Sequence, residues 1–140
     1  PTLLEKIGEG CDVAIASRYQ PGAQTYGVPL ARRLLSDLAR FVFRMLLPIP
    51  GARDYTCGYR AYRASALEQA VDHYGDQLIA ERGFSCMAEV LLKLHRLGRT
   101  IGEVQLQLHY ERRGTQSKMQ VFRTVRETLT LVARHRLRVK

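Results

Sequence analysis

Two stretches of the chain repeat apolar residues at helical spacing. From Pro29 to Leu47, apolar side chains recur every three or four positions along one side, and charged residues follow the other side. A second row predicts a helix from Phe84 to Leu97, with one side buried and Gly98 as its C-terminal cap. Shorter helices are predicted over residues 2–9 and 64–71. The two long apolar rows are Leu30, Leu34, Leu35, Leu38, Phe41, Val42, Met45, and Met87, Val90, Leu91, Leu94.

Strand patterns lie between these helices. Residues 12–17 form a short apolar run without polar alternation, which is typical of a buried, parallel strand. Residues 101–109 alternate apolar and polar side chains for most of their length and predict a half-buried strand. Residues 58–62 predict another short strand, whereas 20–27 and 72–77 predict loops. Ligands bind at the carboxyl ends of strands in open α/β sheets, so chemistry is expected just after residue 17.

The stretch Asp54-Tyr55-Thr56-Cys57-Gly58-Tyr59-Arg60-Ala61-Tyr62-Arg63 combines a carboxylate, a hydroxyl, a glycine and two guanidinium groups. It follows Pro48, Pro50 and Gly51, so Asp54 is expected in a loop that runs into the short strand. Two interpretations are open from these residues alone. The stretch is a tight turn in which Asp54 bonds its own backbone and the arginines are solvated, or it is a functional loop.

Three further groups of polar residues are candidates for chemistry. Arg32 and Ser36 lie one helical turn apart and can share a phosphate, although Arg32 can equally be solvated. Glu89 lies among the apolar residues of the second long helix, where a buried charge requires a partner. Residues 111–118 place three cations and two hydroxyls around Gly114, a composition that can surround an anion or form a solvated basic loop.

Composition narrows the class of protein. The chain has 140 residues, enough to bury a core, and 46% apolar residues, which excludes a disordered chain. No apolar run is long enough for a membrane span, and the start at Pro1 suggests an excised piece. The three cysteines lack metal-ligand spacing and indicate reduced thiols in a cytosolic setting.

Positive charge is concentrated at the C-terminal end. Residues 112–140 hold nine Lys and Arg against one acid, Glu127, so this segment carries +8 of the net +9. From Lys118 onward the apolar and basic residues separate onto two helix faces, which favours a helix on an anionic membrane surface. Packing of its first two turns against the domain's own core is the alternative. A nucleic-acid-binding module is a third possibility, but Phe122 is the only aromatic residue among nine cations, too few for base stacking.

Several motifs together resemble the family 2 glycosyltransferases of the dolichol-phosphate mannosyltransferase type, over almost the whole chain. The pattern D-x-T-C/S-G-Y/F-R-x-Y-R looks like the acceptor-side motif of that family. The matching pieces occur in the family's order: residues 14–19, 32–36, 54–63, Gly83 and Phe84 with Glu89, Leu97 and Gly98, then 111–113 and 117–119. Each piece alone is weak, whereas five or more in order indicate the family.

The resemblance implies an α/β fold, namely the C-terminal half of a GT-A (Rossmann-like) nucleotide-sugar transferase domain, with a mixed sheet flanked by helices. Residues 1–117 would form the acceptor-side half, and 118–140 a basic amphipathic helix at the cytoplasmic face of a membrane. The implied reaction transfers a hexose from a nucleotide sugar, of the GDP-mannose or UDP-glucose type, to a polyprenyl phosphate, with inversion at the anomeric carbon. No nucleic acid is expected as a partner.

The resemblance also suggests roles for individual residues. Asp54, Arg60 and Glu89 are the catalytic candidates, with Asp54 orienting the acceptor or a sugar hydroxyl. The acceptor-phosphate candidates are Arg18, Arg32 and Ser36. The donor-diphosphate candidates are Arg112, Ser117 and Lys118, beside a Mg²⁺ or Mn²⁺ whose ligands are expected outside this chain, which offers no metal ligands of its own.

Two departures from the family pattern keep one alternative open. The chain contains no Asp-x-Asp pair, and Cys86-Met87-Ala88-Glu89 stands where relatives often have Phe-Gln-Ile-Glu. The acceptor can therefore also be a saccharide hydroxyl, in which case Asp54 must act as a general base.

Overall fold

A mixed three-stranded sheet forms the centre of the protein. The structure is a computed structural model that describes residues 2–80, 85–109 and 130. Within these residues the sheet has the order β3 (Arg60–Tyr62), β1 (Val13–Ser17) and β4 (Ile101–Gln105). β1 pairs antiparallel with β3 and parallel with β4, and all five of its residues are buried. The predicted α/β fold with a mixed sheet, and the predicted buried parallel strand, are confirmed.

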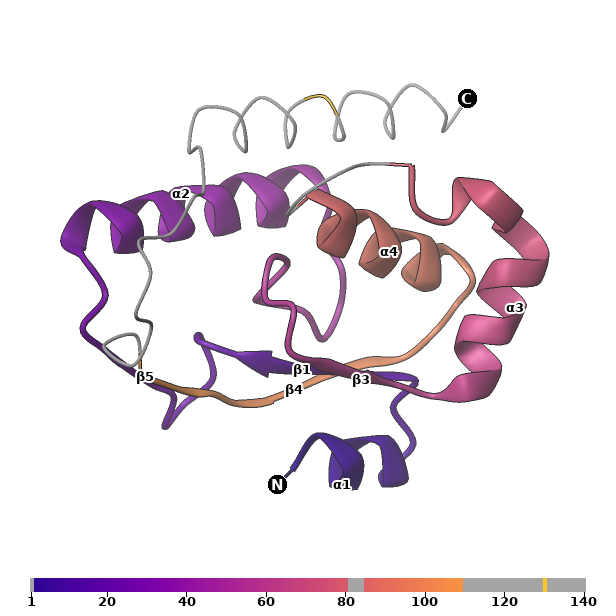
Figure 1. Ribbon diagram of the computed structural model, residues 1–140, viewed down its shortest axis with the longest axis horizontal. Helices are drawn as coiled ribbons and strands as arrows, with labels where there is room; N and C mark the ends of the chain where they lie inside the picture. Colours follow the sequence, from indigo (N-terminus) through magenta and orange to yellow (C-terminus); the bar gives the residue numbers. More distant parts are fainter. Residues whose placement is uncertain (1, 81–84, 110–129, 131–140) are drawn as a thin grey trace.

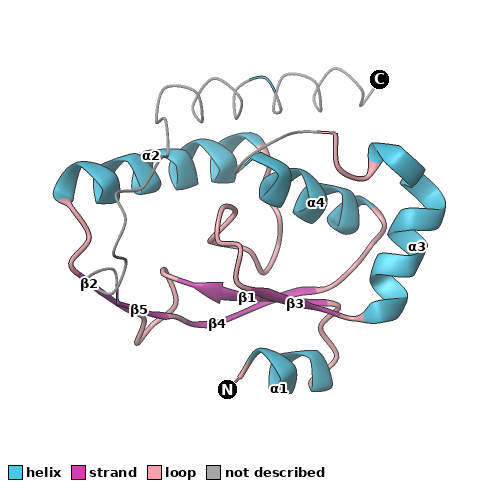
Figure 2. Ribbon diagram, in the orientation of Figure 1, coloured by secondary structure: helices cyan, strands magenta, loops and turns pink. Residues whose placement is uncertain are grey.

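Helices cover both faces of this sheet (Figure 1). The helices α2 (Leu30–Leu46) and α4 (Ser85–Arg96) lie over one face, and α1 (Leu3–Gly8) lies over the other. At one end of the sheet, α3 (Ala64–Tyr74) is followed by a 3-10 turn, η1 (Gly75–Gln77). The loop from α2 to β3 lies on the side of the sheet that faces α2 and α4 (Figure 2).

The core lies between the sheet and the α2–α4 layer. It joins the sheet residues Val13 and Ile15 to Phe43 of α2 and Leu91 of α4, all of them at most 1% exposed. Tyr55 comes from the loop before β3, and its ring stacks on that of Phe43 with centroids 5.2 Å apart. The Tyr55 hydroxyl donates to Leu47 O at 3.1 Å and accepts from Ile49 N at 3.3 Å. The ring therefore fixes the start of the central motif against the end of α2.

A second, two-stranded sheet corrects two sequence predictions. Residues 20–27 were predicted as a loop, but they contain β2 (Gln24–Tyr26), which pairs in parallel with β5 (Gln107–His109). Residues 101–109 are accordingly not one strand but two, β4 and β5, in different sheets. The segment changes sheets at Leu106, whose N–H donates to Ser17 O at 3.1 Å. Three-residue strands that depend on a partner more than 80 positions away leave no local periodicity to detect.

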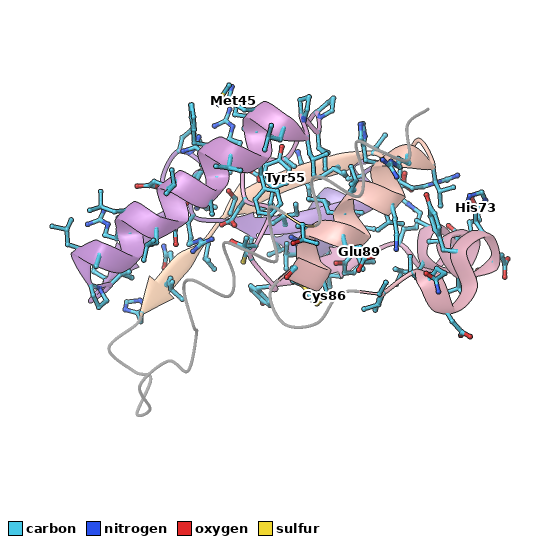
Figure 3. All side chains as sticks on the ribbon, turned by 90° about the horizontal axis from the view of Figure 1, so that it is seen from above. Met45, Tyr55, His73, Cys86 and Glu89 are labelled. Atoms are coloured by element: carbon cyan, nitrogen blue, oxygen red, sulfur yellow. The ribbon has the colours of Figure 1, made fainter. Side chains whose placement is uncertain are left out.

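The helices differ from prediction at two places. Residues 72–77 were predicted as a polar loop, but α3 continues to Tyr74 and η1 follows it. The apolar row of α2 exists as predicted, yet most of it faces away from the core. Five large side chains of this row are more than half exposed: Leu30, Leu34, Leu38, Phe41 and Met45. Phe43, which is not in the row, enters the core from α2, and Leu46 packs against that core. Met45 lies on the side of α2 turned away from α4 (Figure 3).

Candidate functional site

The ion pair between Arg18 and Asp54 is the centre of the candidate site. Arg18 follows the last residue of β1, and Asp54 lies in the loop before β3. The Arg18 guanidinium binds both carboxylate oxygens, with Nε to Oδ2 and Nη2 to Oδ1 each at 2.8 Å. The Arg18 backbone N–H also donates to Oδ2, at 3.2 Å. This two-pronged geometry fixes the guanidinium plane as well as neutralising the charge.

Asp54 is buried, with 1% exposure, and its own loop supplies further donors. The backbone N–H groups of Thr56 and Cys57 donate to Oδ1 at 3.3 and 3.0 Å. Burial by itself would raise the pKa of Asp54, but the hydrogen bonds and charge of Arg18 outweigh it and lower the pKa below its usual value. In this loop Asp54 accepts hydrogen bonds from its own backbone and also binds Arg18. The motif therefore combines features of both interpretations, the tight turn and the functional loop.

The lowered pKa of Asp54 predicts a specific dependence of stability on pH. Because the folded pKa lies below the unfolded value of about 3.9, the ionised pair stabilises the fold above that value. This contribution is lost as the pH falls through the folded pKa. Urea unfolding between pH 7 and pH 3 should therefore show a smaller loss of unfolding free energy in Asp54→Asn than in the wild type. Glu68→Gln on α3, where the side chain is exposed, should keep the wild-type dependence.

Ser36 and Thr56 complete a polar edge around Arg18. Arg18 donates from Nη2 to Thr56 Oγ1 at 3.0 Å and from Nη1 to Ser36 Oγ at 3.4 Å. Of its five N–H donors, one on Nη1 remains without a partner among the described residues. The structure therefore brings together three of the predicted site residues, Arg18, Ser36 and Asp54, while their functional roles stay predictions. Arg32 lies one helical turn before Ser36 on α2, and the structure does not describe its side chain.

Tyr19 lies beside this edge, between two guanidinium groups. The Cζ atom of Arg40 is 4.2 Å from the centroid of the Tyr19 ring, and that of Arg18 is 5.6 Å away. Burial raises the pKa of Tyr19 to about 12, partly offset by the charge of Arg18, so the phenol stays neutral near pH 7. Arg40 follows Ser36 by one helical turn, so α2 presents a hydroxyl and a cation in succession toward Arg18 and Tyr19.

The two arginines of the central motif bind backbone carbonyl groups. Arg60 donates from Nη1 to Met87 O and from Nη2 to Tyr55 O, each at 2.7 Å, and so links the motif to the first turn of α4. Arg63 donates to Ile7 O at 2.7 Å and pairs with Asp12 at 3.4 Å. Arg60 thus joins the loop that carries Asp54 to α4, and a catalytic role for it stays a prediction.

Glu89 is buried on α4 and paired with Lys93. The Lys93 Nζ atom lies 2.7 Å from Glu89 Oε1, and both side chains are at most 6% exposed. The other oxygen of Glu89 accepts the N–H of Ala80 at 3.0 Å. Figure 3 shows Glu89 on α4, with Cys86 closer to the N-terminal end of the helix. The expectation that a buried Glu89 needs a partner is confirmed, and its catalytic role stays a prediction.

The sequence did not indicate Glu103, although this residue touches the site. Its alternation with Val104 placed it on the polar side of a half-buried strand, but Glu103 is only 8% exposed. Its Oε1 atom accepts the N–H of Asp54 at 2.7 Å. The sequence carries no local signal for this contact, because it arises from the pairing of β4 with β1 and the packing of the Asp54 loop on β4.

Metal ligation does not fit the carboxylates that the structure describes. No group of three or more His, Cys, Asp or Glu side chains is arranged to hold a metal ion within residues 2–80 and 85–109. Each buried carboxylate already has donors: Arg18 for Asp54, Lys93 for Glu89, and backbone N–H groups for Glu103. The predicted donor-diphosphate residues, Arg112, Ser117 and Lys118, lie outside the described residues.

Sequence comparison finds relatives of this chain among synthases and transferases named for polyprenol or dolichol phosphates. Over 119 residues, 85% of this chain, it is 34% identical to the undecaprenyl-phosphate mannosyltransferase of Micrococcus luteus. Over 77 residues, 52% of the chain, it is 44% identical to the polyprenol monophosphomannose synthase of Mycolicibacterium smegmatis. The chain is a homologue of these polyprenyl-phosphate mannosyltransferases. A further relative, the dolichol-phosphate mannosyltransferase of Pyrococcus furiosus, is 36% identical over 94 residues.

These alignments confirm the resemblance to mannosyltransferases of the dolichol-phosphate type. This mannosyltransferase homologue spans less than half the length of each relative: 46%, 29% and 25% in the order given. No family model matches it. Within the described part of the homologue, no helix has both the length and the apolar character that a bilayer span requires.

Proposed function

We propose that this chain forms the acceptor side of an enzyme that transfers a mannosyl residue from a nucleotide sugar to a polyprenyl phosphate. The observation that carries the proposal is the fixed guanidinium of Arg18, which offers Nη1 beside Ser36 Oγ at the carboxyl end of β1. The names of the three relatives support the lipid-phosphate acceptor and the mannosyl group. In this proposal Arg18, Ser36 and Arg32 bind the acceptor phosphate.

The chemical state of Asp54 favours a phosphate acceptor over a saccharide hydroxyl. A hydroxyl acceptor needs a general base, but Asp54 is buried, its pKa is lowered, and its oxygens accept several hydrogen bonds. A phosphate monoester has its second pKa near about 6, so its oxygen is already anionic at neutral pH. Its attack on the anomeric carbon then requires positioning and positive charge, which Arg18 supplies. Asp54 acts by holding Arg18 in place.

The donor side of the reaction involves residues outside the described part of the chain. Arg112, Ser117 and Lys118 are proposed to bind the donor diphosphate, because cations there stabilise the negative charge of the leaving group. A divalent cation of the Mg²⁺ or Mn²⁺ type would supply further charge to that diphosphate. The buried carboxylates that the structure describes already accept hydrogen bonds from other groups. The protein ligands of the divalent cation are therefore expected elsewhere in the protein.

Acceptor competition tests the proposed function. The complete protein, given radiolabelled GDP-mannose together with undecaprenyl phosphate and a soluble oligomannoside, is expected to label the lipid phosphate alone. Undecaprenol without its phosphate is the matched control acceptor and is expected to stay unlabelled. Label on the oligomannoside, with none on the lipid phosphate, would instead establish a hydroxyl acceptor and a base elsewhere in the site.

We also propose that the exposed apolar row of α2 contacts an anionic membrane surface. Leu34, Phe41 and Met45 are 62%, 61% and 63% exposed on one side of the helix. The exposed Arg33 and Arg44 belong to the same helix, so α2 combines apolar and cationic groups as helices at the interface of anionic bilayers do. The same helix carries Ser36 on its core side, seven residues before the buried Phe43, so this contact would place the polar edge of the site about one helix diameter from the row.

A tryptophan placed on α2 is expected to report this contact, since the chain contains no tryptophan of its own. Phe41→Trp should show a blue-shifted emission with phosphatidylglycerol vesicles and quenching by brominated acyl chains. Val71→Trp, on an exposed position of α3, is the matched control and should show neither effect. Equal responses of the two reporters would contradict a specific role of α2.

A further inference from the structure

Glu103 of β4 connects the two loops that carry the Arg18–Asp54 pair. Its Oε1 atom accepts the consecutive backbone N–H groups of Arg53, at 2.5 Å, and Asp54, at 2.7 Å. Its Oε2 atom accepts the side-chain amide of Gln20, at 3.1 Å, in the loop after Arg18. One buried carboxylate therefore binds a loop on each side of the ion pair.

The first of these loops lies directly on β4. Gly51 has a φ of +82°, and a Cβ atom there would lie 2.0 Å from the carbonyl oxygen of Ile101. Only glycine allows this approach, because a side chain would collide with the backbone of β4. Gly51 at Ile101 and Asp54 at Glu103 thus place both ends of residues 51–54 along the same strand.

The loop after Arg18 also rests on β4. Gly22, with a φ of +84°, approaches the side chain of Gln105, whose Oε1 would lie 2.4 Å from a Cβ atom at residue 22. Gln20 reaches Glu103 of the same strand. β4 in turn pairs in register with β1, Glu103 opposite Ile15 and Gln105 opposite Ser17, the last residue before Arg18. The strand β4 is therefore a common support for both loops.

Removal of the Glu103 carboxylate would affect the pair through the backbone of its loop. Two N–H groups at residues 53 and 54 would lose their acceptor, and an unsatisfied buried N–H is unfavourable. The Asp54 loop would then move relative to Arg18, whose guanidinium depends on both Asp54 oxygens. Both oxygens of Glu103 are engaged with these donors, so the residue acts through other residues and not on a substrate.

We propose that Glu103 is a positioning residue, which sets the separation of the Arg18 and Asp54 loops and thereby the orientation of Arg18 toward the acceptor phosphate. This inference rests on the proposed transfer to a lipid phosphate. It assigns a role in acceptor binding to a strand residue that does not touch the acceptor. Its signature is a rise in acceptor KM while donor KM stays unchanged.

The test compares Glu103→Ala and Glu103→Gln with Glu68→Ala, a control at an exposed acid of α3, in the complete protein. Glu103→Ala is expected to raise the KM for undecaprenyl phosphate about tenfold to a hundredfold, the range for loss of one charge-assisted hydrogen bond. Glu103→Gln should stay near wild type, because its amide oxygen can accept the two backbone N–H groups. Gln20 can turn its own amide to match.

Hydrogen exchange supplies a readout that does not need turnover. In Glu103→Ala the peptide spanning residues 51–57 should exchange faster than in the wild type, whereas Glu103→Gln should retain its protection. Unchanged acceptor KM and unchanged exchange in Glu103→Ala would overturn the role of Glu103. Equal rises in acceptor and donor KM, or equal losses in the Gln and Ala variants, would also overturn it. Failure of the wild-type protein to label any lipid phosphate would instead refute the proposed function. The exchange result would still show whether Glu103 holds the Asp54 loop in place.

Discussion

Replacement of Arg18 by alanine is expected to destabilise the fold and to abolish most acceptor binding at once. The change leaves Asp54, which is 1% exposed, as a buried carboxylate without its cation. Removing one partner of a buried pair is strongly unfavourable; we expect about 3 kcal/mol, near the lower end of the usual range, because the Arg18 side chain keeps 23% exposure. Urea unfolding measures this loss.

The double variant separates stability from function. In Arg18→Ala/Asp54→Ala the uncompensated carboxylate is gone, so part of the lost stability should return, while transfer to undecaprenyl phosphate should remain low. Each lost charge-assisted contact to the phosphate corresponds to about a tenfold to hundredfold loss in kcat/KM. Arg18→Lys is the matched control for charge alone, because a lysine cannot reproduce the two-pronged geometry. An Arg18→Ala variant as stable as the wild type would contradict a structural role of the pair.

The location of Arg18 was predictable because it depends on a local pattern and a general rule. The apolar run of residues 12–17 predicted a buried parallel strand, and ligand sites lie at the carboxyl ends of such strands. The loop character of residue 54 followed from the preceding prolines and glycine. That Arg18 and Asp54 meet was expected only through the family resemblance, since they are separated by 36 positions.

The roles of polar residues with distant partners could not be predicted. An arginine in a motif can bind a phosphate or a backbone carbonyl, and nothing near Arg60 in the sequence identifies Met87 O as its acceptor. Glu103 alternates with apolar neighbours like a solvent-facing residue, yet its acceptor atoms meet N–H groups 49 and 50 positions away. Such contacts depend on how loops pack on the sheet, which local periodicity does not encode.

The helix α2 shows a different limit of pattern analysis. Helical spacing correctly placed the apolar side chains between positions 30 and 45 on one side of the helix. It does not predict what that side contacts. In the structure the core takes Phe43 and Leu47, while Leu30 and Phe41 stay 71% and 61% exposed. An amphipathic pattern therefore identifies the apolar face of a helix, whereas the surrounding fold determines whether that face is buried.

Replacement of Lys93 by methionine is the second change for which we expect a large effect. Lys93 Nζ bonds Glu89 Oε1 at 2.7 Å and also donates to the carbonyl oxygens of Gln77 and Leu78. Methionine fills a similar volume but leaves the buried Glu89 without this cation, so we expect a loss of about 3–5 kcal/mol in urea unfolding. Lys6→Met is the matched control, because Lys6 pairs with Glu9 at the same 2.7 Å on the exposed helix α1, and it should leave stability almost unchanged.

The double variant Glu89→Gln/Lys93→Met then decides what Glu89 does. Glutamine removes the buried negative charge while its amide oxygen can still accept the N–H of Ala80, so stability should recover relative to Lys93→Met. If the recovered protein also transfers mannose at the wild-type rate, Glu89 is structural, and its position within the family motif reflects the packing of α4. If it is folded but inactive, the Glu89–Lys93 pair is required for the reaction as well as for the fold. A Lys93→Met protein no less stable than Lys6→Met would refute the pair as a determinant of the fold.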